Sequence, residues 1–244
     1  MEEDELIEKS KSWIRSNKKM LIEKFIGDIS YIPDVAPFSM FMAGSPGAGK
    51  TESSKRFIKD FIKRYNRETG NTKKQINVVR IDPDEIRELI PGYNGANAEL
   101  FQGAVSLGVE KLYDYVIAKK LSVVVDGTFA NYTVAHKNIK RAVDKKRKVG
   151  IFYIYQDPLV AWDFTKKRED EDGRHIKKAT FIEAFFKAKI NVNKIKADFG
   201  INIEVLLIIK NYKNDVYRTR FNVDNIDNYL KIKYTKKSLI EKIC

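Results

Sequence analysis

The stretch Gly44-Ser45-Pro46-Gly47-Ala48-Gly49-Lys50-Thr51 carries the strongest structural signal in this 244-residue chain. It matches the pattern G-x-x-x-x-G-K-[ST] at every fixed position. An apolar run, 38–43, precedes it, and a segment with helical spacing of apolar residues, 51–66, follows it. A glycine-rich turn between a strand and a helix points backbone N–H groups inward, and the start of the helix adds positive potential. The sequence therefore predicts a phosphate-binding loop made of these eight residues.

The last two residues of the motif indicate which phosphates are bound. The ammonium group of Lys50 can reach the β- and γ-phosphates of a nucleotide, and the hydroxyl of Thr51 can bind Mg²⁺. We therefore expect ATP or GTP, together with Mg²⁺, as the cofactors. An ordinary glycine-rich turn is the alternative interpretation, and the strand–loop–helix context argues against it.

Apolar runs and amphipathic segments alternate beyond the loop. The predicted strands are 38–43, 77–82, 121–125, 149–155 and 201–209, and the predicted helices between them are 51–66, 97–120, 133–147, 159–168 and 179–197. Such alternation is typical of an α/β fold. We expect a mainly parallel sheet of five or more strands with helices on both faces.

The two ends of the chain differ from this core. Residues 3–28 have the apolar spacing of one amphipathic helix, and 31–37, with two prolines, should break it. The lysine- and tyrosine-rich end is expected to hold a β-hairpin and a final helix. The predicted divisions are an N-terminal helix and linker (1–36), a core (37–210) and a basic C-terminal extension (211–244), forming one compact domain overall because no repeat or long linker separates them.

Composition narrows the possible locations and partners. No apolar run approaches the roughly 20 residues of a membrane span, and the acidic start of the chain lacks the features of a secretory signal, so we expect no membrane contact. A single cysteine suits a reducing compartment, so we expect a cytoplasmic protein. Lys plus Arg is 46 and Asp plus Glu is 33, which gives a net charge of +13. This excess suits nucleic acid or phosphorylated substrates, but mixed charges along the chain also fit plain solubility.

Acidic residues follow two of the predicted strands. Asp84 lies just beyond the strand 77–82, and Asp126 ends the strand 121–125. Ligands of parallel sheets gather at the carboxyl ends of strands. Phosphoryl transfer needs an acceptor for the hydroxyl proton and oxygen ligands for Mg²⁺, so we assign the first role to Asp84 and the second to Asp126. The alternatives are a helix N-terminal acid and a strand-end cap.

A charged, glycine-containing stretch, 168–175, separates two predicted helices and is interpreted as a lid loop. Its arginines, Arg168 and Arg174, can contact the γ-phosphate as it transfers, while the four acids between them should point outward. A solvated loop with local ion pairs is the alternative. With two histidines and one cysteine, a zinc cluster or a Cys–His dyad is excluded.

Taken in order, the loop at 44–51, the segment 81–87, Asp126-Gly127-Thr128 and the two arginines resemble the zeta-toxin family of P-loop kinases over roughly 36–200. The resemblance implies a P-loop kinase core in which Asp84 activates and holds the acceptor hydroxyl. It also implies that Glu110 and Thr128 bind the acceptor, and that Arg168 and Arg174 contact ATP phosphates. The family usually has Glu where this chain has Asp126.

The same resemblance implies a substrate and a partner. Members of the family phosphorylate the 3′-hydroxyl of the sugar in UDP-N-acetylglucosamine and are restrained by an antitoxin protein. The expected activity is therefore transfer of a γ-phosphate to a small-molecule acceptor, a UDP-N-acetyl sugar. Two alternatives stay open: a polynucleotide or RNA-end kinase, suggested by the basic charge and the aromatic tail, and a nucleotide-gated binding module without catalysis.

Overall fold

A computed structural model of the whole chain describes residues 2–27, 34, 36–69, 78–213 and 215–243. The chain divides into two compact units. The first unit is Met1–Phe38 with Thr51–Asp126, and the second is Ser39–Lys50 with Gly127–Cys244. Each unit thus combines separate stretches of sequence. The division expected from the sequence, at 36/37 and 210/211, rests on composition and stays a prediction.

Within the described residues, six strands form one sheet in the order β2-β3-β1-β4-β5-β6. They are β1 (Phe38–Ala43), β2 (Val78–Ile81), β3 (Ser122–Val125), β4 (Lys148–Tyr155), β5 (Glu204–Lys210) and β6 (Val216–Arg220). β2 pairs with β3 in parallel and β4 with β5 in parallel, whereas β6 runs antiparallel to β5. The predicted α/β class, with a mainly parallel sheet of at least five strands, is confirmed.

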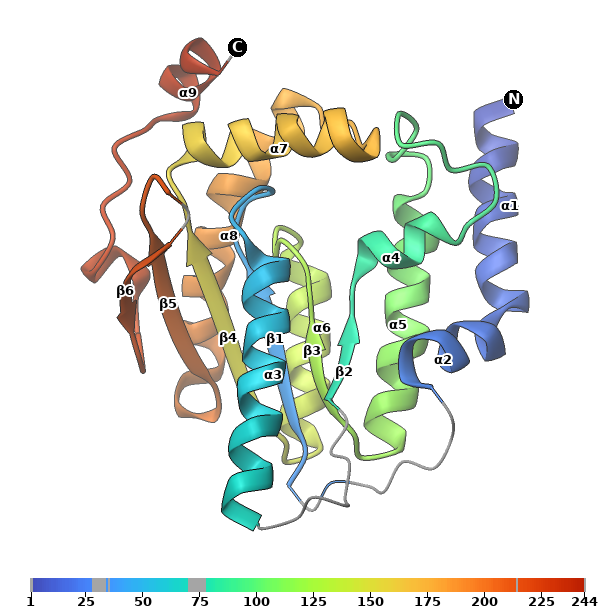
Figure 1. Cartoon of the computed structure of the whole chain (residues 1–244), viewed down its shortest axis with the longest axis horizontal. Coiled ribbons are helices and arrows are strands. Elements are labelled where there is room, and N and C mark those ends of the chain that lie inside the picture. Colours follow the sequence, from blue (N-terminus) through green and yellow to red (C-terminus); the bar gives the residue numbers. More distant parts are fainter. Residues whose placement is uncertain (1, 28–33, 35, 70–77, 214, 244) are drawn as a thin grey trace. The chain divides into compact units, whose positions relative to one another are not determined.

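The first unit is organised around helix α5 (Gln102–Ala118). Three helices pack against it: α1 (Glu2–Ser16), α2 (Lys18–Ile26) and α4 (Pro83–Glu88) (Figure 1). Ile14, Leu21, Ile86 and Leu112, one from each of the four helices, are fully buried. Helix α3 (Lys50–Thr69) belongs to this unit from Thr51 onward.

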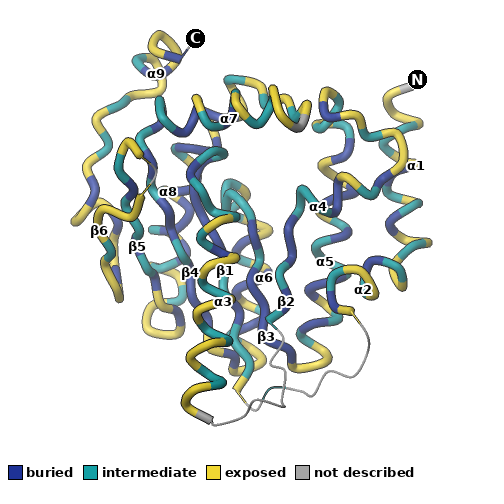
Figure 2. The backbone as a smooth tube through the Cα atoms, in the orientation of Figure 1, coloured by how far each residue is buried: buried dark blue, intermediate teal, exposed yellow. Residues whose placement is uncertain are grey.

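The second unit packs α6 (Tyr132–Asp144) and α8 (Lys178–Phe199) against β4, and α9 (Lys236–Lys242) against α8. Helix α7 (Pro158–Asp172) contributes Trp162 to a buried cluster with aromatic and aliphatic side chains of α8 and α9. The other members are Ala161, Phe181, Ile182, Phe185, Leu239 and Ile243. Strand β6 is mostly exposed, in contrast to β4 (Figure 2).

The structure corrects two predicted boundaries. The segment 3–28 is not one helix, because α1 ends at Ser16 and α2 begins at Lys18. Between them, Asn17 stands outside helical geometry, and its side-chain amide donates to the carbonyl of Trp13 at 2.9 Å. The predicted loop at 168–175 is helical as far as Asp172, where Gly173 ends α7 in the left-handed conformation.

Most of the proline-containing break at 31–37 lies outside the described residues. The C-terminal end was expected to hold a β-hairpin of its own, but its described residues contribute one strand, β6, which pairs with the core strand β5. The expected final helix corresponds to α9. Among the residues that the structure describes, none of the helices combines the length and the apolar character needed to cross a membrane.

Candidate functional site

The predicted phosphate loop lies between β1 and the start of α3, and all of it except Thr51 belongs to the second unit. Gly44 and Gly47 have φ values of +143° and +71°, which side chains other than glycine rarely allow. The space around them is also closed. A Cβ atom at Gly44 would stand 2.4 Å from the carbonyl oxygen of Ile154, and one at Gly47 would stand 1.9 Å from that of Ala161. The loop therefore packs its backbone directly on β4 and α7.

Three hydrogen bonds hold the loop from different elements of the second unit. The ammonium group of Lys50 donates to the carbonyl oxygen of Ser45 at 2.6 Å, so it folds back over the loop. The buried Lys210, at the end of β5, donates to the carbonyl of Gly49 at 3.3 Å. The backbone N–H of Gly44 donates to the carbonyl of Thr128 at 3.2 Å. Two cations thus accompany the backbone N–H groups of this loop, an arrangement suited to a polyphosphate.

Helix α7 carries Arg168 on the face that meets the loop. Thr165, which is buried, has its hydroxyl 2.8 Å from the position of a Cβ at Gly47. Arg168 follows three residues later, and residues three or four apart share a helix face. The geometry therefore directs Arg168 to the side of the loop. Arg174 comes just after Gly173, at the end of α7.

One acid of this segment, Glu169, is engaged in local ion pairs. Glu169 pairs with Lys166 in the same helix and with His175 beyond its end. Hydrogen bonds from Lys166 and His175 lower the pKa of the Glu169 carboxyl. These contacts explain why α7 continues past Arg168: each of them bridges the last turn of the helix. The role of Arg168 and Arg174 at a γ-phosphate stays a prediction.

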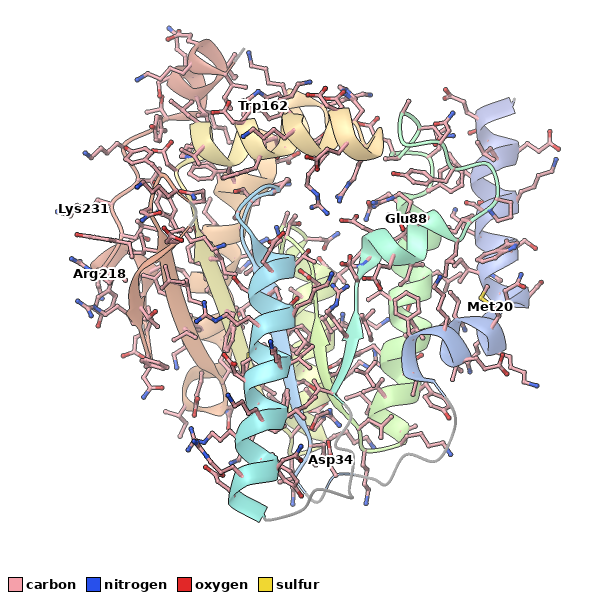
Figure 3. All side chains as sticks on the ribbon, viewed as in Figure 1. Met20, Asp34, Glu88, Trp162, Arg218 and Lys231 are labelled. Carbon is pink, nitrogen blue, oxygen red and sulfur yellow. The ribbon has the colours of Figure 1, made fainter. Side chains whose placement is uncertain are left out.

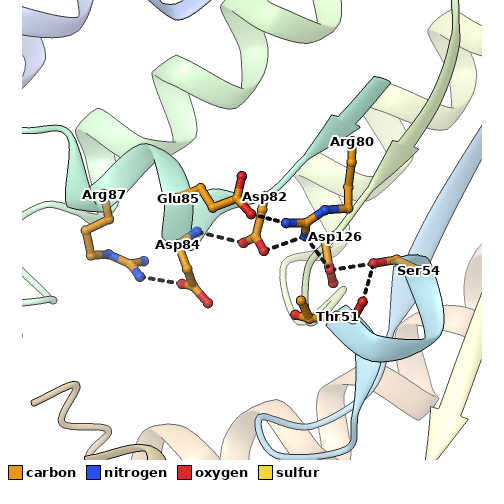
Figure 4. A network of polar contacts seen from close by, with 8 residues as sticks. All are labelled: Thr51, Ser54, Arg80, Asp82, Asp84, Glu85, Arg87 and Asp126. Carbon is orange, nitrogen blue, oxygen red and sulfur yellow. Dashed lines mark hydrogen bonds and ion pairs between the residues drawn. The ribbon is translucent and has the colours of Figure 1, made fainter. Parts of the chain in front are cut away.

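The first unit contains a network of carboxylates around one guanidinium group, that of Arg80 on β2 (Figure 4). Its Nη1 atom lies 2.6 Å from Asp82 Oδ2 and 3.1 Å from Asp126 Oδ2, and its Nη2 atom pairs with Glu85. Burial alone would lower the pKa of Arg80, but the hydrogen bond to Asp82 and the charges of the three acids raise it. Arg80 thus compensates acids that would otherwise repel one another.

Asp84, in the first turn of α4, is held by contacts with the residues at both ends of this helix. Asp82 caps the helix by accepting a hydrogen bond from the backbone N–H of Asp84 at 2.9 Å, and Pro83 occupies the first turn. Arg87, one turn later, donates from Nη1 to Asp84 Oδ1 at 2.6 Å and from Nη2 to Gln102 Oε1 at 3.2 Å. The Asp84 side chain is 27% exposed, so its carboxylate is both fixed and accessible.

Asp126 and Thr51 are connected through one serine. The Ser54 hydroxyl contacts both Asp126 Oδ2 and the Thr51 carbonyl oxygen at 2.9 Å (Figure 4). A hydroxyl and a carboxylate are the hard oxygen donors that Mg²⁺ accepts when phosphates and waters complete its shell. The residues present therefore fit Mg²⁺. Within the described residues, no group of three or more His, Cys, Asp or Glu is arranged to hold a metal by itself.

The two residues expected to bind the acceptor lie in different units. Glu110 is half-buried on α5, the helix against which α4 packs. Thr128 is half-buried in the second unit, where its carbonyl accepts from Gly44 and its hydroxyl accepts from the N–H of Ala130 at 3.4 Å. Their contact with an acceptor stays a prediction.

Among the residues of these networks that had no role in the sequence-based prediction are Ser54, Arg80, Arg87 and Lys210. Two of them left a signal. Arg80 interrupts the apolar strand Val78–Ile81, and Lys210 ends the apolar strand Glu204–Lys210. A charge within a buried strand usually has a partner. Ser54 and Arg87 stand at helical positions where polar residues are common.

Comparisons with known proteins place the chain in a family. A family model described as zeta toxin matches residues 23–222. The chain is similar to a solved structure from the PezAT chromosomal toxin-antitoxin system of Streptococcus pneumoniae, with a TM-score of 0.61 and 17% identity, over 97% of this chain and 87% of that one. It is also similar to a chain of the AvrRxo1-ORF1:-ORF2 structure with ATP, with a TM-score of 0.56 and 17% identity, over 94% and 72% of the two chains.

No curated protein sequence matches the chain. At 17% identity the two solved structures show the fold, which is that of the P-loop kinases, and the family follows from the model match. That match spans most of the chain and includes the phosphate loop, the carboxylate network and both arginines. The protein therefore belongs to the zeta toxin family.

Proposed function

We propose that this protein is a kinase that transfers the γ-phosphate of ATP or GTP, with Mg²⁺, to a hydroxyl group of a small acceptor, a UDP-N-acetyl sugar. The observation that carries the proposal is the phosphate loop. Its glycines pack without room for a side chain, and Lys50 folds over it. The zeta toxin family match and the similarity to the AvrRxo1-ORF1:-ORF2 structure, which was solved with ATP, support the same conclusion.

The proposed reaction assigns a step to each group. Asp84 accepts the proton of the acceptor hydroxyl, whose oxygen then forms a bond to the γ-phosphorus. The bond between that phosphorus and the bridging oxygen of the β-phosphate breaks, and ADP leaves when ATP is the donor, or GDP when it is GTP. Lys50, Arg168 and Arg174 stabilise the negative charge on the phosphates, and Glu110 and Thr128 hold the acceptor. Mg²⁺, held by Thr51 and Asp126, would neutralise phosphate charge.

Radiolabel transfer from γ-labelled ATP tests this proposal. The acceptors are UDP-N-acetyl sugars, nucleosides, nucleotides and 5′-hydroxyl RNA, each with Mg²⁺ and with EDTA. We expect label on a UDP-N-acetyl sugar only with Mg²⁺. Lys50→Ala should abolish transfer and ATP binding at the phosphate loop, and Asp84→Asn should abolish transfer while ATP still binds there. Undiminished transfer by Asp84→Asn would contradict the assignment of the base.

A second candidate is an RNA-end kinase, favoured by one surface of the second unit. Tyr217 and Phe221 are 68% and 74% exposed at β6, and the Arg218 guanidinium lies over the Tyr217 ring. Arg218 and Lys231 project outward on this side (Figure 3). Exposed aromatic rings can stack on bases while cations follow phosphates. Label on 5′-hydroxyl RNA, lost in Tyr217→Ala, would favour this candidate over the sugar kinase.

An antitoxin partner is part of the proposal. It is supported by the family and by the similarity to the PezAT structure, which comes from a toxin-antitoxin system. If the proposed activity is toxic, production of the wild-type chain should arrest growth of the host, and Lys50→Ala should not. Growth arrest by both proteins would separate toxicity from phosphoryl transfer.

A further inference from the structure

We propose that the first unit contains a second anion site, separate from the phosphate loop, that binds a small ligand with two or more phosphate groups. The site is an open pocket of about 420 Å³ lined by residues of α2, α3, α4 and β2. We call it the lysine pocket. Its lining residues are Lys24, Phe25, Lys55, Ile58, Lys59, Val78, Arg80 and Glu85. Such a volume is within the range of small-molecule sites.

Positive charge predominates in the lysine pocket. Three lysines and Arg80 face it, against the single acid Glu85, and Glu85 is already paired with Arg80. Lys24, Lys55 and Lys59 form no ion pair or hydrogen bond with any residue that the structure describes. Positive charges that converge without a counter-ion repel one another, and a phosphate removes that repulsion.

Helix α3 provides an internal comparison. On another part of its surface, Arg56 pairs with Asp60 and Arg64 pairs with Glu68, each at the i,i+4 spacing that stabilises a helix. Lys55 and Lys59 have the same spacing but carry like charges, which is mildly destabilising. The same helix thus pairs its cations elsewhere and leaves these two facing the pocket.

The remaining lining residues limit the size and type of ligand. Phe25, Ile58 and Val78 supply apolar surface beside the cations. Cations from α2, α3 and β2 line the pocket, so a chain of phosphates can contact more of them than a single phosphate can. Two sources share this chemistry: a free inorganic polyphosphate and the phosphate chain of a nucleotide, whose base would cover the apolar surface.

The lysine pocket is connected to the carboxylate network by Arg80. This side chain lines the pocket and also contacts Asp82 and Asp126. A bound anion would therefore contact the same guanidinium group as Asp82, which caps α4, and Asp126, which is assigned to Mg²⁺. The inference does not rest on the proposed kinase activity, because ligand binding can be measured without transfer.

The experiment measures binding of tripolyphosphate and ATP by calorimetry, in EDTA, in the Lys50→Ala background so that the phosphate loop does not contribute. We expect one remaining site for tripolyphosphate. Lys55→Gln with Lys59→Gln should weaken it about tenfold or more, given the usual strength of charged contacts. The matched control, Arg56→Gln with Arg64→Gln, removes two charges from the same helix and should change affinity less than about twofold.

The two ligands distinguish the sources. Equal affinity for tripolyphosphate and ATP would identify free polyphosphate as the ligand. Tighter binding of ATP than of tripolyphosphate, with the difference lost in Phe25→Ala, would identify a nucleotide. The proposal is wrong if neither ligand binds or if both double variants lose affinity equally. Thermal unfolding of both double variants shows whether any loss reflects misfolding.

Discussion

Among single residues, Arg80 stands out because one side chain contacts three carboxylates. Its own side chain is 12% exposed, and those of Asp82 and Asp126 are 9% and 4% exposed. At this depth water screens charges poorly, so removing one partner leaves the others uncompensated. From its position on β2, Arg80 therefore supplies the positive charge that these three acids share.

We expect Arg80→Met to lower the free energy of unfolding by about 3–5 kcal/mol at neutral pH, the usual cost of breaking a buried ion pair. Urea unfolding at neutral pH measures the loss. Arg218→Met, at an exposed position in β6, is the control and should cost less than about 0.5 kcal/mol. A loss in Arg80→Met as small as that of the control would contradict the assignment of Arg80 as the compensating charge.

Gly47 supports a prediction about nucleotide affinity. A methyl group there would overlap the Ala161 carbonyl and require a left-handed conformation, which costs about 1–2 kcal/mol even without a clash. Gly47→Ala should displace the loop and reduce ATP affinity about tenfold or more. The control is Gly127→Ala, where a Cβ would meet nothing within 4 Å. Calorimetric titration with ATP is the measurement, and wild-type affinity in Gly47→Ala would refute the packing argument.

The residues of the phosphate loop were predictable because the motif and its flanking pattern are local in sequence. The partners of its acids were not. Ser54 and Asp126 are 72 residues apart, and Arg80 and Asp126 are 46 apart. Such contacts depend on which strands become neighbours, and one sequence without structure does not specify that. The roles of the individual site residues stay predictions.

Among the elements, helix α7 is connected to the C-terminal segment through its N-cap residue, Asp157. Asp157 caps the helix by accepting from the N–H of Leu159 at 3.0 Å through Oδ1, and its Oδ2 accepts from the hydroxyl of Tyr234 at 3.0 Å. Tyr234 precedes α9, so one hydrogen bond connects the C-terminal segment to the helix that carries Arg168. Burial, followed by this hydrogen bond, raises the pKa of Tyr234 to about 12.

This contact predicts a change in stability at alkaline pH. The pKa of Tyr234 is higher in the folded state than its usual 10.0, so its contribution is complete below pH 10 and is lost as pH rises toward about 12. Tyr234→Phe should lower the free energy of unfolding by about 1 kcal/mol at pH 8. The difference from wild type should vanish near the folded-state pKa. Urea unfolding at pH 8 and above 10 checks this, and a constant difference would contradict it.

Element boundaries show what hydrophobic spacing does and does not reveal. It identified every strand of the sheet core, yet it merged α1 with α2 because Asn17 interrupts the backbone without interrupting the apolar pattern. It ended α7 too early because Arg168 begins a fully charged stretch. There, ion pairs such as that of Lys166 with Glu169 support the helix instead of apolar contacts. Helix α4 was missed because its six residues are too few for a period.

For the whole molecule, the predicted machinery is divided between the two units. The first unit holds Thr51, Asp84, Glu110 and Asp126, and the second holds the loop from Gly44 to Lys50 with Thr128 and both arginines. The border between the units passes between Lys50 and Thr51, within the motif itself. A motif that is continuous in sequence gives no sign of such a division, since only tertiary contacts define it.

Most of the phosphate loop belongs to the second unit, so we expect a bound nucleotide to raise the free energy of unfolding mainly through contacts with that unit. At an ATP concentration of a hundred times Kd, a ligand that binds only the folded state adds about 2.7 kcal/mol to the free energy of unfolding. We expect this gain in wild type and in Asp84→Asn, whose loop is intact, but not in Lys50→Ala. Because the loop packs on Ala161 and Thr165, amide hydrogen exchange should slow in residues 44–50 and in α7 when ATP is added. Equal stabilisation of Lys50→Ala by ATP would place the nucleotide elsewhere, and the lysine pocket would then be the first site to test.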